Sequence, residues 1–249
     1  MSRYPVRLRG LVVPGLFAAA AFTVLVGLGL WQLERKAWKE DLIEALTRRI
    51  AASPSALPPS GSWSQLNRAD AEFRRLAVRV EFIPAPEGRV YTGGSALRAD
   101  ISAPGYFVFS PARLADGDLV VVNRGYVANP HPNRETRALA RPQGFVEIIG
   151  ALRWPEQRAW FVPEHDQKSD VWFVRDHLAM AAAYDWTTKA PFYIEQEAPV
   201  PPSGLPRPGK LKANLPNNHL EYALTWFGLA AALTGVFAVF ALQKLRENA

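Results

Sequence analysis

Two long stretches without any charged residue lie near the two ends of the chain. The first covers residues 11–33 and the second covers residues 222–243. Each is longer than the roughly 20 apolar residues that a helix needs to cross a bilayer core about 30 Å thick. The pattern therefore predicts two transmembrane helices, with the residues between them held on one side of a membrane.

A cleavable secretory signal is the alternative for the first stretch. Its apolar run exceeds the roughly 7–15 residues of a signal's hydrophobic region, and Trp-Gln-Leu-Glu-Arg-Lys at 31–36 follows it instead of a small-residue cleavage site. Both features favour a permanent anchor. No Arg- and Ser-rich transit segment precedes the stretch, which favours a bacterial plasma (inner) membrane over an organelle.

The short tails predict the orientation. Residues 1–10 carry arginines and no acidic residue, and residues 244–249 carry two basic residues against one acidic residue. The positive-inside rule places both tails in the cytoplasm and residues 34–221 in the periplasm. Basic residues within 35–39 argue against this orientation, but they are interleaved with acidic residues in a long segment, where charge matters less.

The central segment shows both helical and strand periodicity. Apolar residues at helical spacing, from Trp38 to Ile50, predict that the first helix continues as an amphipathic helix over residues 34–52. From Phe73 the period changes to two, which is typical of half-buried strands. Expected strands cover residues 76–82, 105–110, 119–127, 145–152, 171–174 and 192–194.

Local signals complete the predicted fold class. An Asp-Gly turn within residues 115–118 predicts a hairpin, and Asp176 is placed to cap a helix over residues 177–184. A Pro-rich stretch at 199–216 is typical of a stiff connector back to the membrane. The prediction is a membrane α plus mainly antiparallel β protein, in which two transmembrane helices flank a periplasmic α+β domain.

The composition excludes several classes of function. The chain has no cysteine and two methionines, so disulfides, thiolate metal sites and thiolate copper carriage are excluded. The net charge of +6 comes from scattered basic residues without a basic-aromatic motif, so no nucleic-acid partner is expected. Motifs of phosphate-binding loops, serine hydrolases and zinc proteases are missing from the sequence. Asp116 and Asp118 are interpreted as turn residues rather than a catalytic pair.

The four histidines are not at metal-ligand spacing from one another. His131, His165 and His177 are expected to be surface or capping residues. His219 differs, because it stands at the edge of the second uncharged stretch, where an ionisable residue suggests a functional site. A histidine in the lipid headgroup layer is the alternative reading.

On a helix, the face of His219 continues with Tyr222 and Trp226, which are also candidates for an interfacial aromatic belt. A neutral imidazole beside aromatic rings, without a cysteine, suits haem iron better than zinc or copper. If the two helices meet, Trp31 and Arg35 come near His219 on the same side of the membrane. Arg35 is then a candidate partner for a haem propionate; a salt bridge to an acidic neighbour or plain solvation is the alternative.

Small residues are expected to let the helices approach closely. The candidates are Gly27 and Gly29 on the first helix, with Gly228 and Ala232 on the second.

Five segments in order resemble one known family. They are Gly29-Leu-Trp-Gln-Leu-Glu-Arg-Lys-Ala-Trp-Lys39, the central pair 105–111 and 122–127, Trp172-Phe-Val-Arg-Asp176, Ala190-Pro-Phe-Tyr-Ile194, and Asn217-Asn-His-Leu-Glu-Tyr-Ala-Leu-Thr-Trp-Phe-Gly-Leu229. Together they resemble the Surfeit-locus-one proteins, assembly factors of haem-copper terminal oxidases. Tyr126 stands where the central motif often has Trp.

The resemblance implies a non-enzymatic role in maturing the catalytic subunit of cytochrome c oxidase. It implies transient binding of haem A, with His219 as the iron ligand. We expect Trp31, Tyr222 and Trp226 to form apolar walls beside the haem. Haem A synthase, the catalytic subunit and membrane lipid are the implied partners. Two alternatives stay open: a scaffold that binds no haem, and a membrane-anchored hydrolase, which the missing catalytic set disfavours. The sequence does not distinguish a cytochrome c oxidase from a quinol oxidase.

Overall fold

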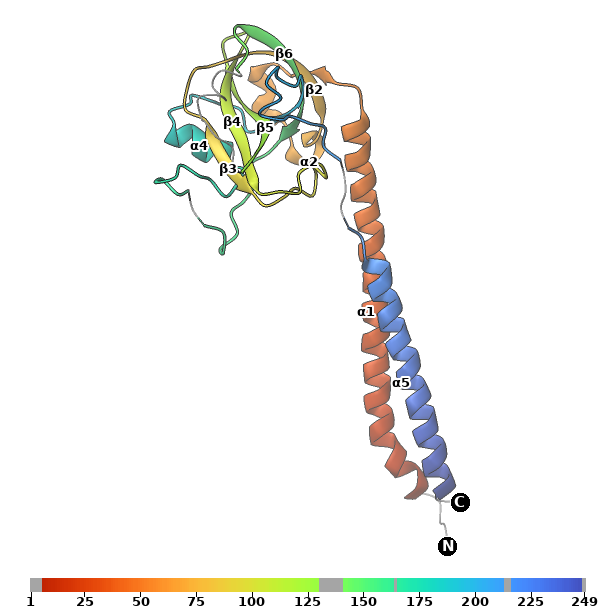
Figure 1. The fold of residues 1–249 in the computed structure, drawn as a ribbon. Coiled ribbons are helices and arrows are strands. Elements are labelled where there is room, and N and C mark those ends of the chain that lie inside the picture. The colour runs from red at the N-terminus through yellow and green to blue at the C-terminus, as the bar shows by residue number, and fades with distance from the viewer. Residues whose placement is uncertain (1–5, 130–140, 164, 213–215, 248–249) are drawn as a thin grey trace. The chain divides into compact units, whose positions relative to one another are not determined.

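The computed structural model describes residues 6–129, 141–163, 165–212 and 216–247 (Figure 1). The chain divides into two compact units, which we call the helical unit (residues 1–44 and 216–249) and the β unit (residues 45–215). Two apolar helices near the ends of the chain and a central domain rich in antiparallel strands confirm the predicted fold class.

The helical unit consists of α1 (Val6–Ala51) up to residue 44, and α5 (His219–Glu247). The two helices run antiparallel, so α1 begins near the end at which α5 finishes (Figure 1). Both are long and apolar enough to cross a membrane. Neither contains a charged residue over the stretches 11–33 and 222–243, as a span requires.

The helices meet along a seam with a seven-residue repeat. Such a repeat is typical of left-handed helix pairs, because two turns of helix return a side chain to the same face. The repeat positions are Gly15, Phe22 and Gly29 on α1, and Ala223, Ala230 and Phe237 on α5.

The seam corrects three of the four small-residue predictions. Gly29 is buried in the seam, as expected. Gly27, Gly228 and Ala232 are exposed, and a Cβ on either glycine would have no neighbour within 4 Å. These three positions fall outside the seven-residue repeat, so small side chains there do not bring the helices together.

The β unit is built on a seven-stranded sheet in the order β1-β2-β6-β7-β5-β4-β3. An additional pairing of β2 with β4 closes five of these strands into a ring, which leaves no free edge among them. The strands are β1 (Ser55–Ala56), β2 (Arg75–Phe82), β3 (Gly88–Thr92), β4 (Gly105–Leu114), β5 (Leu119–Ala128), β6 (Phe145–Arg153) and β7 (Tyr193–Ala198).

Alternate residues of the strands enter two apolar clusters. Val120 and Val122 of β5 belong to one cluster, and Val121 belongs to the other. Burial on both faces explains why β5 is almost continuously apolar in sequence. Three short helices complete the unit: η1 (Ser60–Gln65), α2 (Arg68–Ala71) and α4 (His177–Ala183).

Most of the predicted strands are present. The hairpin of β4 and β5 turns at Ala115–Asp118, where the Leu114 amide donates to the Asp118 carbonyl and Gly117 has a φ of +93°. The prediction of a strand over residues 171–174 is wrong, because only isolated bridges form at Val171 and Trp172. β3 was not predicted, and the parallel pairing of β5 with β7 carries no local sequence signal.

The start of the predicted connector at 199–216 packs against the β unit. Arg207 and Tyr126 exchange two backbone hydrogen bonds, and the Lys212 amide donates to the Leu97 carbonyl. Leu211 is buried with Leu46 and Ile50 of α1. The described part of this stretch, residues 199–212, therefore packs along the β unit and is not a free spacer; we call it the strap.

The amphipathic face predicted beyond the first span is only partly buried. Leu46 and Ile50 belong to the β unit and pack in its core. Trp38 and Leu42, which the periodicity placed on the same face, are 51% and 38% exposed.

Candidate functional site

His219 is the first residue of α5, and its ring contacts the neighbouring helix. Its Nδ1 lies 2.7 Å from Oε1 of Gln32 on α1. An amide oxygen only accepts hydrogen bonds, so the Nδ1 nitrogen donates and carries the ring proton. In the neutral form of the ring the lone pair is then on Nε2, which has no hydrogen-bond partner within the described residues.

The seam explains why these two side chains meet. Gln32 lies three residues after Gly29, on the same face of α1. The buried Gly29 and Ala223 keep the helix backbones close at this level. Gln32 and His219 are both half-buried, so their hydrogen bond is partly protected from water.

The aromatic residues predicted around His219 are on the helices as expected but do not enclose it. Trp31 is 53% exposed and Tyr222 is 56% exposed, whereas Trp226 is half-buried. No ring–ring contact joins the three side chains in the part of the chain that the structure describes. They offer apolar surface near the end of the helix pair rather than a closed pocket.

Arg35 stacks on a neighbouring ring. Its guanidinium carbon lies 3.9 Å from the centre of the Trp38 ring, and both side chains are exposed. The nearby carboxylate of Glu40 is bound by Lys36 at 2.7 Å instead. Arg35 is therefore held by a cation–π contact, from which it would have to turn to meet an anionic group.

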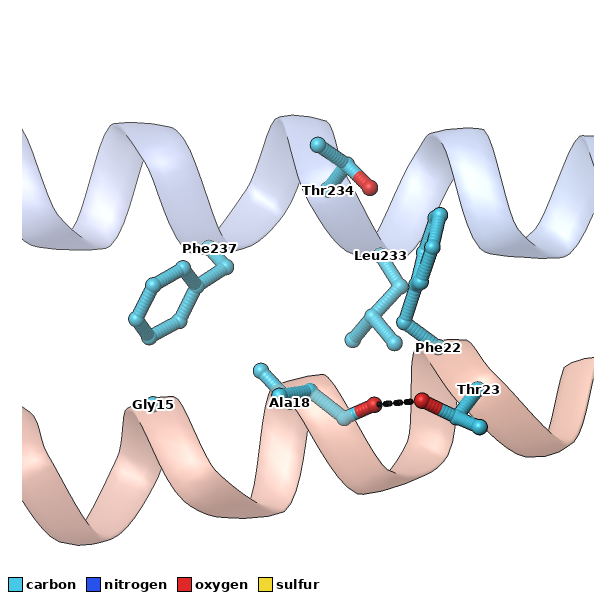
Figure 2. A pocket seen from close by; sticks show the side chains of 8 residues that line it. Gly15, Ala18, Phe22, Thr23, Leu233, Thr234 and Phe237 are labelled. Carbon is cyan, nitrogen blue, oxygen red and sulfur yellow. Dashed lines mark hydrogen bonds between the residues drawn. The ribbon is translucent and has the colours of Figure 1, made fainter. Parts of the chain in front are cut away.

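Two apolar cavities of the helical unit lie further along the helices than His219. One has a volume of about 370 Å³, and Figure 2 shows Phe22, Leu233 and Phe237 lining it. The other has a volume of about 570 Å³ and shares Ala18, Leu233 and Phe237 with the first. Neither is lined by a titratable side chain. The hydroxyls of Thr23 and Thr234 donate to carbonyls of their own helices.

The other histidines differ from one another. His177 was expected to be a surface or capping residue but is fully buried, and its Nε2 donates to the Ala190 carbonyl at 3.0 Å. Burial lowers the pKa of His177, against the opposing effect of that carbonyl. His165 stacks on Trp172, with ring centres 4.0 Å apart. His131 lies outside the described residues.

The acidic residues show no obvious catalytic grouping. Among the described residues, no group of three His, Cys, Asp or Glu side chains is arranged to hold a metal ion. Asp116 accepts a hydrogen bond from the Asp118 amide within the exposed hairpin turn, in agreement with its interpretation as a turn residue.

Known proteins match almost the whole chain. The SURF1 family model matches residues 19–231. The SURF1-like protein of Drosophila melanogaster is 36% identical over 219 residues, which cover 83% of this chain and 70% of the fly protein. Surfeit locus protein 1 of Homo sapiens is 33% identical, with the same coverage of 83% and 70%.

The chain belongs to the SURF1 family. The matched region contains all five segments that carried the resemblance, and it contains both Gln32 and His219. The match to the SURF1 family therefore covers most of α1, the whole β unit and the start of α5. Gln32 lies within the first of these segments, but the sequence alone does not mark it as a site residue, because an uncharged amide gives no titration or ligand signal.

Proposed function

We propose that this SURF1-family chain is an assembly factor for a haem-copper terminal oxidase. In this role it receives haem A from haem A synthase and passes it to the catalytic subunit of the oxidase, with His219 as the iron ligand. The observation that carries the proposal is the hydrogen bond between His219 and Gln32. The ring of His219 is fixed through Nδ1, and the Nε2 nitrogen, which carries the lone pair when the ring is neutral, has no partner within the described residues.

The residues around His219 fit a haem that is held and then released. The neutral imidazole of His219 would supply a nitrogen ligand to haem iron. Trp31, Tyr222 and Trp226 supply apolar surface on the same end of the helix pair. The exposed guanidinium of Arg35 would bind a propionate after turning from the Trp38 ring. The open arrangement supports transfer, because a cargo enclosed on all sides would need a large rearrangement before release.

A scaffold that binds no haem is the second candidate. The lack of an enclosed pocket at His219 favours it, since His219 lines neither of the two cavities described in the helical unit. In this reading the hydrogen bond between His219 and Gln32 only fastens the two helices. The exposed face with Trp31 and Tyr222 would then contact an oxidase assembly intermediate.

An absorption spectrum separates the two candidates. The protein is expressed in membranes that make haem A, purified in mild detergent, and compared with His219→Ala and with His165→Ala as a matched histidine control. We expect a haem A Soret band in the wild type and in His165→Ala, and its loss or shift in His219→Ala. Equal bands in all three would place the ligand elsewhere. No haem in any of them, with the synthase active, would favour the scaffold.

We further propose a two-pass arrangement in the inner membrane, with both termini in the cytoplasm and the β unit in the periplasm. The support is the excess of basic residues in the short tails. Because the chain has no cysteine, single cysteines introduced at the exposed Asp116 of the β unit and at the exposed Leu245 of the C-terminal tail would report the two sides. A membrane-impermeant thiol reagent should label the first and not the second in intact cells.

A further inference from the structure

We infer that Gln32 is a positioning residue for His219, which holds the imidazole as the Nδ1-protonated tautomer and so makes Nε2 the ligating nitrogen. This inference rests on the proposed function, because it assigns Gln32 a part in the same haem site. The contact joins two residues 187 positions apart in the chain at 2.7 Å, and both are half-buried. Neither sequence segment alone suggests it.

The chemistry of the pair supports orientation of the ring without a change of charge. Histidines that bind metals usually donate their second N–H to a carboxylate or carbonyl group, which fixes the tautomer and the ring orientation. A carboxylate also makes the ring a stronger base and hence a tighter ligand. A neutral amide oxygen fixes the ring without adding a negative charge, and this suits a site that must release its cargo.

Neighbouring charged groups on the same two helices are engaged elsewhere or are exposed. Lys36 binds Glu40, and the Arg35 guanidinium lies over Trp38. Glu221 is exposed on α5. Gln32 is therefore the group that determines which ring nitrogen of His219 carries the proton.

The first test reads the tautomer without any haem. Nitrogen NMR of the haem-free protein labelled at histidine distinguishes a protonated from an unprotonated ring nitrogen, and His219→Ala assigns the signals. We expect the proton of His219 on Nδ1 in the wild type and the loss of this fixed state in Gln32→Leu. A wild-type proton on Nε2, or the same tautomer in both proteins, would overturn the inference.

The second test reads haem retention and the reduction potential. Loss of a residue that supports a metal ligand typically weakens metal binding by about 10–100-fold, and we expect that range for Gln32→Leu. Gln32→Glu keeps an acceptor and adds a charge, so it should retain haem at least as well as the wild type and lower the potential. Gln243→Leu, at an exposed position of α5, should change neither quantity.

A double-mutant cycle separates positioning from a general effect on folding. If Gln32 acts through His219, Gln32→Leu should weaken haem retention in the wild type and add no further loss to His219→Ala. Additive losses would show that Gln32 acts on packing alone and would overturn the inference. If His219→Ala retains haem like the wild type, the proposed ligand fails first, and the NMR result then shows whether Gln32 still fixes the ring.

Discussion

Gly29 faces the ring of Phe227 so closely that no side chain fits between them. A Cβ built on Gly29 would lie 2.5 Å from Cε1 of Phe227, well inside van der Waals contact. This close approach lies one helical turn before Gln32 on α1. The distance between the helices at this level therefore governs whether Gln32 can reach His219.

We expect Gly29→Ala to weaken the pairing of α1 and α5. The ring of Phe227 must move to admit the methyl group, and overpacking of this kind typically costs about 1–3 kcal/mol. The measurement is energy transfer between dyes on cysteines introduced at the exposed Val12 and Val239, followed as SDS is added. The variant should lose energy transfer at a lower SDS fraction than the wild type.

Gly27→Ala is the matched control for this prediction. Gly27 is exposed, and a Cβ there would have no neighbour within 4 Å. Because alanine is favoured over glycine inside a helix by roughly 0.5–1 kcal/mol, this variant should be neutral or more stable. Equal weakening in both variants would show that Gly29 has no special role in the seam.

The strap at residues 199–212 should depend on Gly125 of β5. Gly125 has a φ of +127°, and a Cβ on it would lie 2.3 Å from backbone atoms of Arg207. Backbone cannot rotate away as a side chain can. We expect Gly125→Ala to cost about 3–5 kcal/mol in the free energy of unfolding of the β unit, from strain and a displaced strap together.

The control for Gly125 separates strain from packing. Gly117 also has a positive φ, +93°, but a Cβ there would meet nothing within 4 Å. Gly117→Ala should therefore show only the backbone cost of about 1–2 kcal/mol. Both variants are compared by guanidinium unfolding followed by tryptophan fluorescence, with proteolysis within residues 199–212 as a second readout. Similar losses in the two variants would contradict a packing role for Gly125.

Local patterns predicted the elements of the β unit but not their closure. Alternation over 76–82 and the Asp-Gly turn after Leu114 are local properties, and β2, β4 and β5 formed as expected. The closure depends on Val80–Phe82 pairing with Ala112–Leu114, and on the parallel pairing of β5 with β7. Such pairings between distant segments have no signature in either segment.

Of the two hydrogen-bonded residues in the candidate site, only His219 could be predicted from the sequence. His219 could be singled out because it is ionisable and stands at the edge of an apolar stretch. Its partner Gln32 could not, since uncharged amides are common and the contact depends on the exact seam. The same seam explains why Gly29 was a correct prediction for helix contact and Gly27, two residues earlier on another face of α1, was not.

His177 should make the β unit less stable in mild acid. Its side chain is fully buried on α4, and burial lowers its pKa below the ordinary value of 6.5. The folded protein therefore keeps the ring neutral at pH values where the unfolded chain takes up a proton. The stabilising contribution is present above about pH 6.5 and is lost as the pH falls toward the lowered pKa, with a slope of up to about 1.4 kcal/mol per pH unit.

Denaturant unfolding of the wild type and His177→Gln between pH 7.5 and 5.5 measures this contribution. The variant should be less stable at pH 7.5, but its stability should fall less on acidification, because glutamine does not titrate. Met180→Leu, a buried substitution on the same helix, should lower stability by less than about 1.5 kcal/mol and leave the pH dependence unchanged. An equal pH dependence in the wild type and His177→Gln would mean that another group accounts for the acid sensitivity.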